Sequence, residues 1–291
     1  MILILPIAGS QRSVRCVKHF KMNRSRRGGQ YAFPDSVVRW LLAWKQLVDY
    51  RGLEGITRTL AEMHVIPYYP DYTTIWHRIH DLVPEVGIDG LDHGVAADGT
   101  GLKTSNAGEY RIIKYGDPYA SQKKHLIVVI TADVKTKKIL GISVRIEGKW
   151  RSEADGASDH IREAVKRGAH VRSFYGDGTY DTNKMFDLLG KDGIDPIIKI
   201  RKNAASDIYR GSKYRRRAVK KCQESSYKEW SQKKHYGMRW PGTEGIFSAV
   251  KRKFGENTVS RSKEGLIAEG YQRFWAYDQM REYGEKRVIK T

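Results

Sequence analysis

The stretch VRSFYGDGTYD, residues 171–181, decides the fold. Its first six positions include the β-branched Val171 and the aromatic Phe174 and Tyr175, which indicates a strand. The strand would end at Asp177, where an Asp-Gly-Thr sequence begins. In α/β sheets, the ends of the strands are where side chains converge on a shared crevice. The stretch therefore predicts an α/β protein with an acidic side chain at the functional edge of its sheet.

A second acid stands in a similar context earlier in the chain. Residues 94–98, GVAAD, predict a short buried strand that ends at Asp98, with Gly99 next. Either Asp-Gly pair alone is equally typical of a plain turn. If the two strands are neighbours, the two carboxylates repel each other unless a cation lies between them. Oxygen ligands without a Cys or His cluster favour Mg²⁺ or Mn²⁺.

The segments around these strands predict the rest of the sheet. Residues 110–115 and 125–132 are expected strands, and the second is apolar on both faces, as a central strand is. Helices are expected near residues 161–165 and 185–189, and a last strand at 196–200. This order predicts a mixed sheet with helices packed on it.

Composition points to a polyanionic partner. Lys and Arg number 53 against 33 Asp and Glu, which gives a formal net charge of +20. Nucleic acid is the partner that best explains this charge, and a generic basic protein is the alternative. Two cysteines give no disulfide framework, and no apolar run approaches the ~20 residues that span a bilayer. We therefore expect a cytoplasmic, nucleoid-associated protein without a membrane partner.

The N-terminal third predicts an arm followed by a helical domain. Residues 1–30 form the expected arm, in which residues 11–27 hold seven basic side chains and no acid. Such an arm gains phosphate contacts without folding, although a solvated tail has the same composition. Residues 31–90 show apolar side chains at helical spacing in three segments.

The third helical segment has the polar residues that a DNA reader needs. A helix-turn-helix domain would present them to DNA, and a plain three-helix bundle shows the same pattern. The residues expected to be exposed there for DNA contact are Thr73, Thr74, His77 and Arg78.

A strongly basic stretch follows the last expected strand. Residues 199–221 hold ten Lys and Arg side chains against one acid, Asp207. We interpret residues 199–240 as a basic insertion that binds phosphate, with a disordered surface loop as the alternative. Its expected DNA contacts include Arg215, Arg216 and Arg217.

A third carboxylate is expected on a later helix. Residues 243–254 have apolar side chains on one helical side, and Glu244, Ser248 and Lys251 stack on a separate face. On that face Glu244 can complete a metal site while Lys251 holds a nearby phosphate. A solvated helix face would show the same residues.

Three runs of sequence together resemble a known family. They are ADGTG at 97–101, YGDGTYD at 175–181 and YGMRWPGTEGIFSAVKRKF at 236–254. These runs resemble the DDE transposases of bacterial and archaeal insertion sequences, over roughly residues 93–280. The resemblance implies a ribonuclease-H-like catalytic domain at 91–291 with Asp98, Asp177 and Glu244 as catalytic residues and metal ligands.

The resemblance also implies a Tyr-Arg-Glu-Lys signature, which maps onto Tyr236, Arg239, Glu244 and Lys251. Tyr236, Arg239 and Lys251 are then expected DNA contacts. The usual signature has three residues between Arg and Glu, whereas here there are four and one is Pro241. Since a proline starts or kinks a helix, Tyr236 and Arg239 are expected ahead of the helix that carries Glu244.

The activity that the resemblance implies is metal-dependent phosphoryl transfer with two divalent cations. Such an endonuclease and polynucleotidyl transferase cleaves the terminal inverted repeats of its own element and joins the 3′-hydroxyl ends to target DNA. It would act on double-stranded DNA as a homodimer assembled there. The alternatives are a metal nuclease of the same fold without joining, and a DNA-binding protein such as a repressor or an inactive transposase copy.

Overall fold

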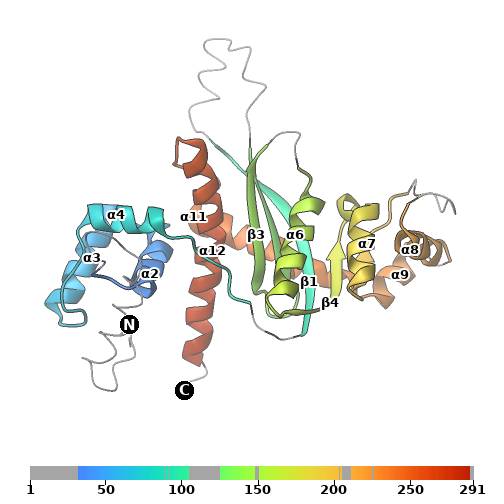
Figure 1. Ribbon diagram of the computed structural model, residues 1–291, viewed down its shortest axis with the longest axis horizontal. Coiled ribbons are helices and arrows are strands. Elements are labelled where there is room, and N and C mark those ends of the chain that lie inside the picture. The colour runs from blue at the N-terminus through green and yellow to red at the C-terminus, as the bar shows by residue number, and fades with distance from the viewer. Residues whose placement is uncertain are drawn as a thin grey trace, which may run out of the picture. The chain divides into compact units, whose positions relative to one another are not determined.

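The computed structural model describes residues 32–88, 90, 92–104, 125–147, 151–202, 204, 211–224 and 226–288 (Figure 1). The chain divides into two compact units, Met1–Pro84 and Glu85–Thr291. The expected basic arm at 1–30 and the expected strand at 110–115 lie outside the described residues.

The first unit contains three described helices, α2 (Asp35–Lys45), α3 (Tyr50–Glu62) and α4 (Tyr72–Asp81). Aspartates begin two of them, because Asp49 accepts a hydrogen bond from the backbone N–H of Gly52 and Asp71 accepts one from Thr74. Their apolar faces form a small core. It includes Val38, Leu41, Leu42, Leu53, Ile75 and Ile79, all at most 2% exposed.

Two side chains of α4 lie opposite to where the pattern predicted them. Arg78 is 6% exposed, donates to the carbonyl oxygen of Phe33 and pairs with Asp35 at 2.7 Å. Trp76 is one of the apolar side chains at helical spacing in the third segment, which predicts a place in the core, but it is 42% exposed and lies against the ring of His80. The expected exposure of Arg78 is therefore wrong, because its charge is neutralised inside the unit at the start of α2. Thr73 and His77 are exposed and Thr74 is partly exposed.

The second unit is built on a mixed sheet of five described strands in the order β3-β2-β1-β4-β5 (Figure 1). The strands are β1 (Asp92–Leu102), β2 (Leu126–Asp133), β3 (Ile139–Ile146), β4 (His170–Gly176) and β5 (Asp195–Ile198). The first three pair antiparallel, and β4 pairs parallel with both β1 and β5. The expected ribonuclease-H-like sheet is thereby confirmed.

Two details of the sheet differ from expectation. The strand β1 does not end at Asp98, because the next four residues pair with β2 as far as Leu102. The strand β3 was not predicted, since Gly141 and Ser143 interrupt its apolar pattern. A methyl group at position 141 would lie 2.3 Å from the ring of His160. The packing of His160 on β3 therefore requires a glycine at this position of the strand.

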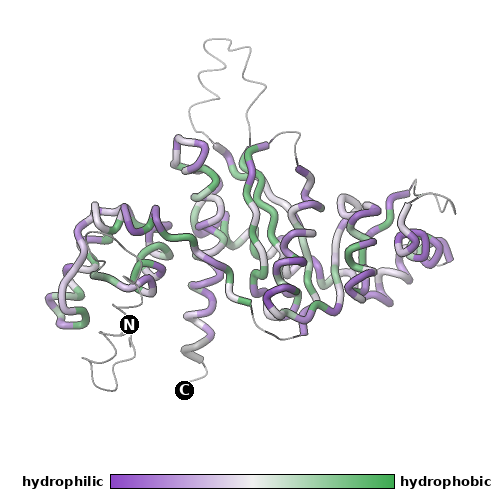
Figure 2. Tube along the Cα trace, in the orientation of Figure 1, coloured by the Kyte–Doolittle hydropathy of each residue, from purple (hydrophilic) through white to green (hydrophobic). Residues whose placement is uncertain are grey.

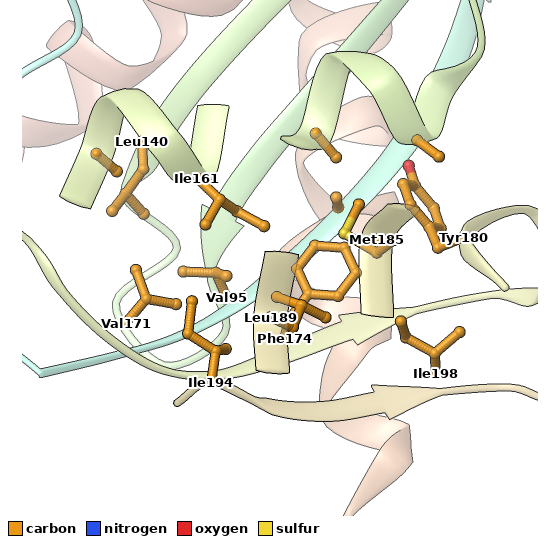
Figure 3. Close-up of a cluster of buried hydrophobic side chains, with 14 of the residues drawn as sticks. Val95, Leu140, Ile161, Val171, Phe174, Tyr180, Met185, Leu189, Ile194 and Ile198 are labelled. Atoms are coloured by element: carbon orange, nitrogen blue, oxygen red, sulfur yellow. The ribbon is translucent and has the colours of Figure 1, made fainter. Parts of the chain in front are cut away.

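Helices cover both faces of the sheet. On one face, α6 (Glu153–Lys166) and α7 (Asn183–Lys191) enclose the core that Figure 3 shows, with Val95, Ile161 and Phe174 among its members. On the other, α12 (Lys263–Val288) packs on β2 and β3, where Gly270 faces Leu126. Figure 2 shows the resulting contrast between hydrophobic strands and the hydrophilic α8.

The remaining elements follow β4 and β5. They are η2 (Gly178–Tyr180), α8 (Lys213–Gln223), α9 (Tyr227–Lys233), η3 (Tyr236–Met238), α10 (Arg239–Gly242) and α11 (Glu244–Phe254). The basic stretch is thus helical over α8, which Ser212 caps through the backbone N–H groups of Tyr214 and Arg215. The alternative of a disordered loop is wrong for that part.

Candidate active site

Neighbouring strands place Asp98 and Asp177 on one face of the sheet. In the parallel pair of β1 and β4, Ala96 lies opposite Tyr175, and both belong to one buried cluster. Ala97 belongs to the cluster on the other face. Because side chains alternate along a strand, Asp98 follows Ala96 onto its face, and Asp177, directly after β4, follows Tyr175.

The side chain of Asp98 is partly buried, with 17% of its surface exposed. It accepts hydrogen bonds from the backbone N–H of Gly99 at 2.9 Å and from the guanidinium of Arg239 at 3.2 Å. Burial raises the pKa of Asp98, and the charges of Asp177 and Glu244 raise it further, against the effect of these two donors. The three carboxylates therefore share one electrostatic neighbourhood.

Asp177 borders an open cleft. Its Oδ1 accepts from the backbone N–H of Thr179 at 2.8 Å, which begins the η2 turn. The cleft has a volume of about 630 Å³. Basic and aromatic side chains line it beside Asp177, among them Lys199, Arg201, Lys202, Tyr227 and Trp240.

Glu244 is the first residue of α11 and is exposed. As Pro241 indicated, Tyr236 and Arg239 lie ahead of this helix, in η3 and α10, and the irregular backbone of Thr243 separates them from it. Lys251 lies near the other end of α11, where its Nζ is 4.0 Å from Glu256. Whether Lys251 contacts phosphate stays a prediction.

The donor set fits a hard divalent cation in its chemistry. The side chains that come together are carboxylates, which suit Mg²⁺ or Mn²⁺. Among the residues that the structure describes, however, no three His, Cys, Asp or Glu side chains are close enough to hold an ion jointly. Arg239 is the positive group that balances the buried charge of Asp98.

Two expected DNA contacts, Tyr236 and Arg239, also have structural roles. Tyr236 is 5% exposed, and its hydroxyl donates to the carbonyl oxygen of Gly176 at 3.1 Å, so it supports the end of β4. Arg239 is 8% exposed and lies over the rings of Tyr236 and Trp240, with its charge on Asp98. Both side chains also line the cleft beside Asp177, so their contact with DNA stays a prediction.

The three expected arginines of the basic stretch divide in the same way. Arg215 holds the fully buried carboxylate of Asp181 through two hydrogen bonds of 2.6 and 3.0 Å. Arg216 donates to the carbonyl oxygen of Gly211, while Arg217 is exposed on α8. The expectation that Arg215 is free for phosphate is therefore wrong, since removing it would strand a buried charge.

Sequence reasoning missed two residues close to the triad, Glu153 and Tyr180. The charges of Asp98 and Asp177 act on both of them. No local signal marked Glu153, because a glutamate after Ser152 reads as ordinary helix-start chemistry. Tyr180 lay in a quoted run but read as core.

A ribonuclease-H-like sheet with acids gathered on one face of β1 and β4 defines the class of metal-dependent polynucleotidyl transferases and endonucleases. The family follows from the sequence. A family model described as "Transposase DDE domain" matches residues 89–278, and a second with the same description matches residues 11–107. The chain belongs to this family of DDE transposases, whose members use divalent metal ions.

Weak likenesses to solved structures are found among integrases and transposases. The catalytic core domain of BIV integrase is 12% identical, with a TM-score of 0.29, over 61% of this chain and 80% of that one. The Drosophila P element transposase strand transfer complex is 9% identical, with a TM-score of 0.34, over 95% and 86%. The Mos1 transpososome is 10% identical, with a TM-score of 0.26, over 88% and 80%. The family assignment rests on the sequence match.

No helix in the described part of the chain is long and apolar enough to cross a membrane.

Proposed function

We propose that this transposase cleaves the terminal inverted repeats of an insertion sequence and joins the freed 3′-hydroxyl ends to target DNA. The observation that carries the proposal is the placement of Asp98 and Asp177 on one face of the sheet at neighbouring strands, in a chain that belongs to the DDE transposase family. Asp98 is partly buried, and the charges of Asp177 and Glu244, which lie in two other segments of the chain, add to burial in raising its pKa. A protein gathers such like charges where a cation balances them during its work.

Asp98, Asp177 and Glu244 would hold the divalent cations, two in this proposal. When bound, these ions supply an activated attacking oxygen and stabilisation of the leaving oxygen at phosphorus. Arg239 holds Asp98 in place from the side of α10. Tyr236 fixes the end of β4, and with it the position of Asp177.

The cleft beside Asp177 is the proposed path of the DNA strand. Lys199, Arg201 and Lys202 line it and suit phosphates, while Tyr227 and Trp240 offer ring faces for bases. Lys251 is the proposed contact to a backbone phosphate near Glu244. The proposed partners are target DNA and the terminal repeats of the element. We expect the protein to form a homodimer on this DNA and to act at the nucleoid in the cytoplasm.

The roles of Glu244 and Lys251 can be tested separately on a DNA fragment bounded by the inverted repeats that flank the gene. Glu244→Gln should bind this DNA with wild-type affinity but not cut it with Mg²⁺, because a neutral amide is a poor cation ligand. Lys251→Ala should bind precleaved ends more weakly and cut slowly, because a phosphate contact is lost.

Lys253→Ala is the matched control, since Lys253 is exposed on the same helix about half a turn around from Glu244. It should behave as wild type. If Glu244→Gln cuts at the wild-type rate, the assignment of the third carboxylate is wrong. If Lys251→Ala equals the Lys253 control, Lys251 has no role at the site.

A further inference from the structure

A fourth carboxylate, that of Glu153, lies against β1 at the level of the active site. Glu153 is the first residue of α6 and is partly buried. A methyl group at Gly99 would lie 2.5 Å from its carboxyl carbon and 2.6 and 2.7 Å from its two oxygens. Only glycine at position 99 leaves room for this carboxylate, and Gly99 is the neighbour of Asp98.

The carboxylate of Glu153 reaches the strand from the face opposite to Asp98. Gly99 shares the face of Val95 and Ala97, which pack against α6, whereas Asp98 shares the face of Ala96. Burial is the largest cause that raises the pKa of Glu153. The negative charges of Asp98 and Asp177 raise this pKa further. Among the described residues Glu153 makes no hydrogen bond or ion pair, although the charge of Arg145 acts on it and lowers its pKa.

An independent observation comes from Tyr180, which Figure 3 shows at the edge of the core below α6. Its ring is fully buried, and its hydroxyl finds no hydrogen-bond partner within the described structure. Burial is the largest cause that raises the pKa of Tyr180, and the charges of Asp98, Glu153 and Asp177 raise it further. A buried hydroxyl without a partner is unfavourable, and a bound ligand or water is one way to satisfy it.

On the basis of the proposed function, we propose that Glu153 is a fourth carboxylate of the divalent-cation site, reaching it over Gly99. Asp98 and Asp177 hold the site from one face of the sheet, and Glu153 closes it from the other. Tyr180 is a positioning residue, whose hydroxyl donates to Glu153 or to a water on the cation. The site then has ligands from β1, the end of β4, α6 and α11.

The competing role for Glu153 is local, because an acid in the first turn stabilises a helix through its dipole. Two features speak against this role alone. Ser152 and Asp155 already cap α6 through a reciprocal pair of hydrogen bonds. The helix dipole also explains neither the glycine at position 99 nor the approach of the carboxylate toward Asp98.

Binding of Mn²⁺ to the full chain without DNA, followed by the EPR signal of unbound Mn²⁺, measures the site independently of cleavage. Glu153→Gln should lower the affinity for Mn²⁺ by about 10- to 100-fold, as loss of a site carboxylate or its support does. Glu153→Asp keeps the charge at the helix start but shortens the reach, so it should lose affinity as well. Glu163→Gln is the control, since Glu163 is exposed farther along α6.

The Asp177→Asn variant separates this proposal from the function on which it rests. If Asp177→Asn loses Mn²⁺ affinity while both Glu153 variants bind as wild type, Glu153 lies outside the site and the proposed function stands. If Asp177→Asn also binds as wild type, the cation site itself is wrongly assigned. If Glu153→Gln loses Mn²⁺ affinity but Glu153→Asp binds Mn²⁺ as wild type does, Glu153 acts through its charge at the start of α6. That result would overturn the proposal.

A steric test uses the gap at Gly99. Gly99→Ala should reduce Mn²⁺ affinity as Glu153→Gln does, because its methyl group must displace the carboxylate. In the double variant the two losses should not add, since both act through one side chain. Gly101→Ala is the control, because the nearest side-chain atom to its methyl group is 3.6 Å away. Additive losses would mean that the methyl group acts on Asp98, and would contradict the proposal.

Discussion

At the scale of single residues, the fold repeatedly buries ionisable groups in matched environments, and His160 is the clearest case. Its ring packs on Gly141, and its Nδ1 is 2.9 Å from the hydroxyl of Thr131. Burial, as the largest cause, lowers the pKa of His160 to about 4, against the opposing charge of Asp159. The folded protein therefore keeps this histidine neutral at pH values where the unfolded chain protonates it.

This difference predicts an acid-sensitive contribution to stability. Between pH 6.5 and about 4 the unfolded chain binds the extra proton, so the free energy of unfolding falls as the pH falls. The full effect of one such histidine is about 3 kcal/mol. His160→Asn keeps a polar group for Thr131 but does not titrate. Urea unfolding at pH 7 and pH 4.5 should show a smaller loss in the variant, and an equal loss in both proteins would rule out His160 as the source.

At the scale of elements, one ion pair fastens α8 to the rest of the second unit. Asp181, just after η2, has a fully buried side chain, and it accepts from the side chain of Arg215 and from the backbone N–H of Arg201. The same helix presents basic side chains to solvent at i, i+4, i+7 and i+8. They are Lys213, Arg217, Lys220 and Lys221. The inward arginine is thus structural, and the outward face is the surface that remains for DNA.

Removing the inward arginine should therefore affect folding. Arg215→Ala should lower the free energy of unfolding by about 3–5 kcal/mol, because it leaves the carboxylate of Asp181 buried without its partner. Arg217→Ala, on the exposed side of the same helix, should change it by less than about 0.5 kcal/mol. Urea unfolding of both variants tests the assignment. A fully stable Arg215→Ala protein with weakened DNA binding would restore the interpretation of Arg215 as a phosphate contact.

Local patterns predicted the elements whose signals are local. The strand before Asp177 and the helix that carries Glu244 follow from apolar spacing, whereas the ribonuclease-H-like form of the sheet was expected from the family resemblance. Other features depend on partners far along the chain. Arg78 is buried and Arg215 is partly buried because each pairs with an aspartate, Asp35 or Asp181, far along the chain. In the same way, β3 carries Gly141 because His160 packs there. Glu153 was missed for the same reason, because its carboxylate packs against Gly99 on strand β1, far from it in the sequence.

At the scale of the whole molecule, we expect DNA phosphates to balance part of the net charge of +20. Binding of a polyanion releases counterions, so the logarithm of DNA affinity should fall linearly with the logarithm of the salt concentration. The slope counts the phosphates that the protein neutralises. It therefore tests which parts of the surface are used.

The exposed face of α8 should account for part of this slope. Replacing Arg217, Lys220 and Lys221 with Ala should flatten the slope by up to about three units. The control replaces three exposed lysines at the other end of the sheet, Lys135, Lys137 and Lys166. This change removes the same three positive charges. Equal slopes for the two triple variants would show that only net charge matters and that α8 is a solvated face.

The most direct test of the central claim is a strand-transfer reaction with precleaved element ends, Mg²⁺ and a target plasmid. Wild-type protein should join the 3′-hydroxyl ends to the plasmid. Ends that carry a 3′-deoxy terminus should give no joined product. The Asp98→Asn and Asp177→Asn variants should bind the ends and join none, because the carboxylates that hold the cations are gone. Joining by either Asn variant at the wild-type rate, or cleavage of DNA by the wild type without any joined product, would contradict the account.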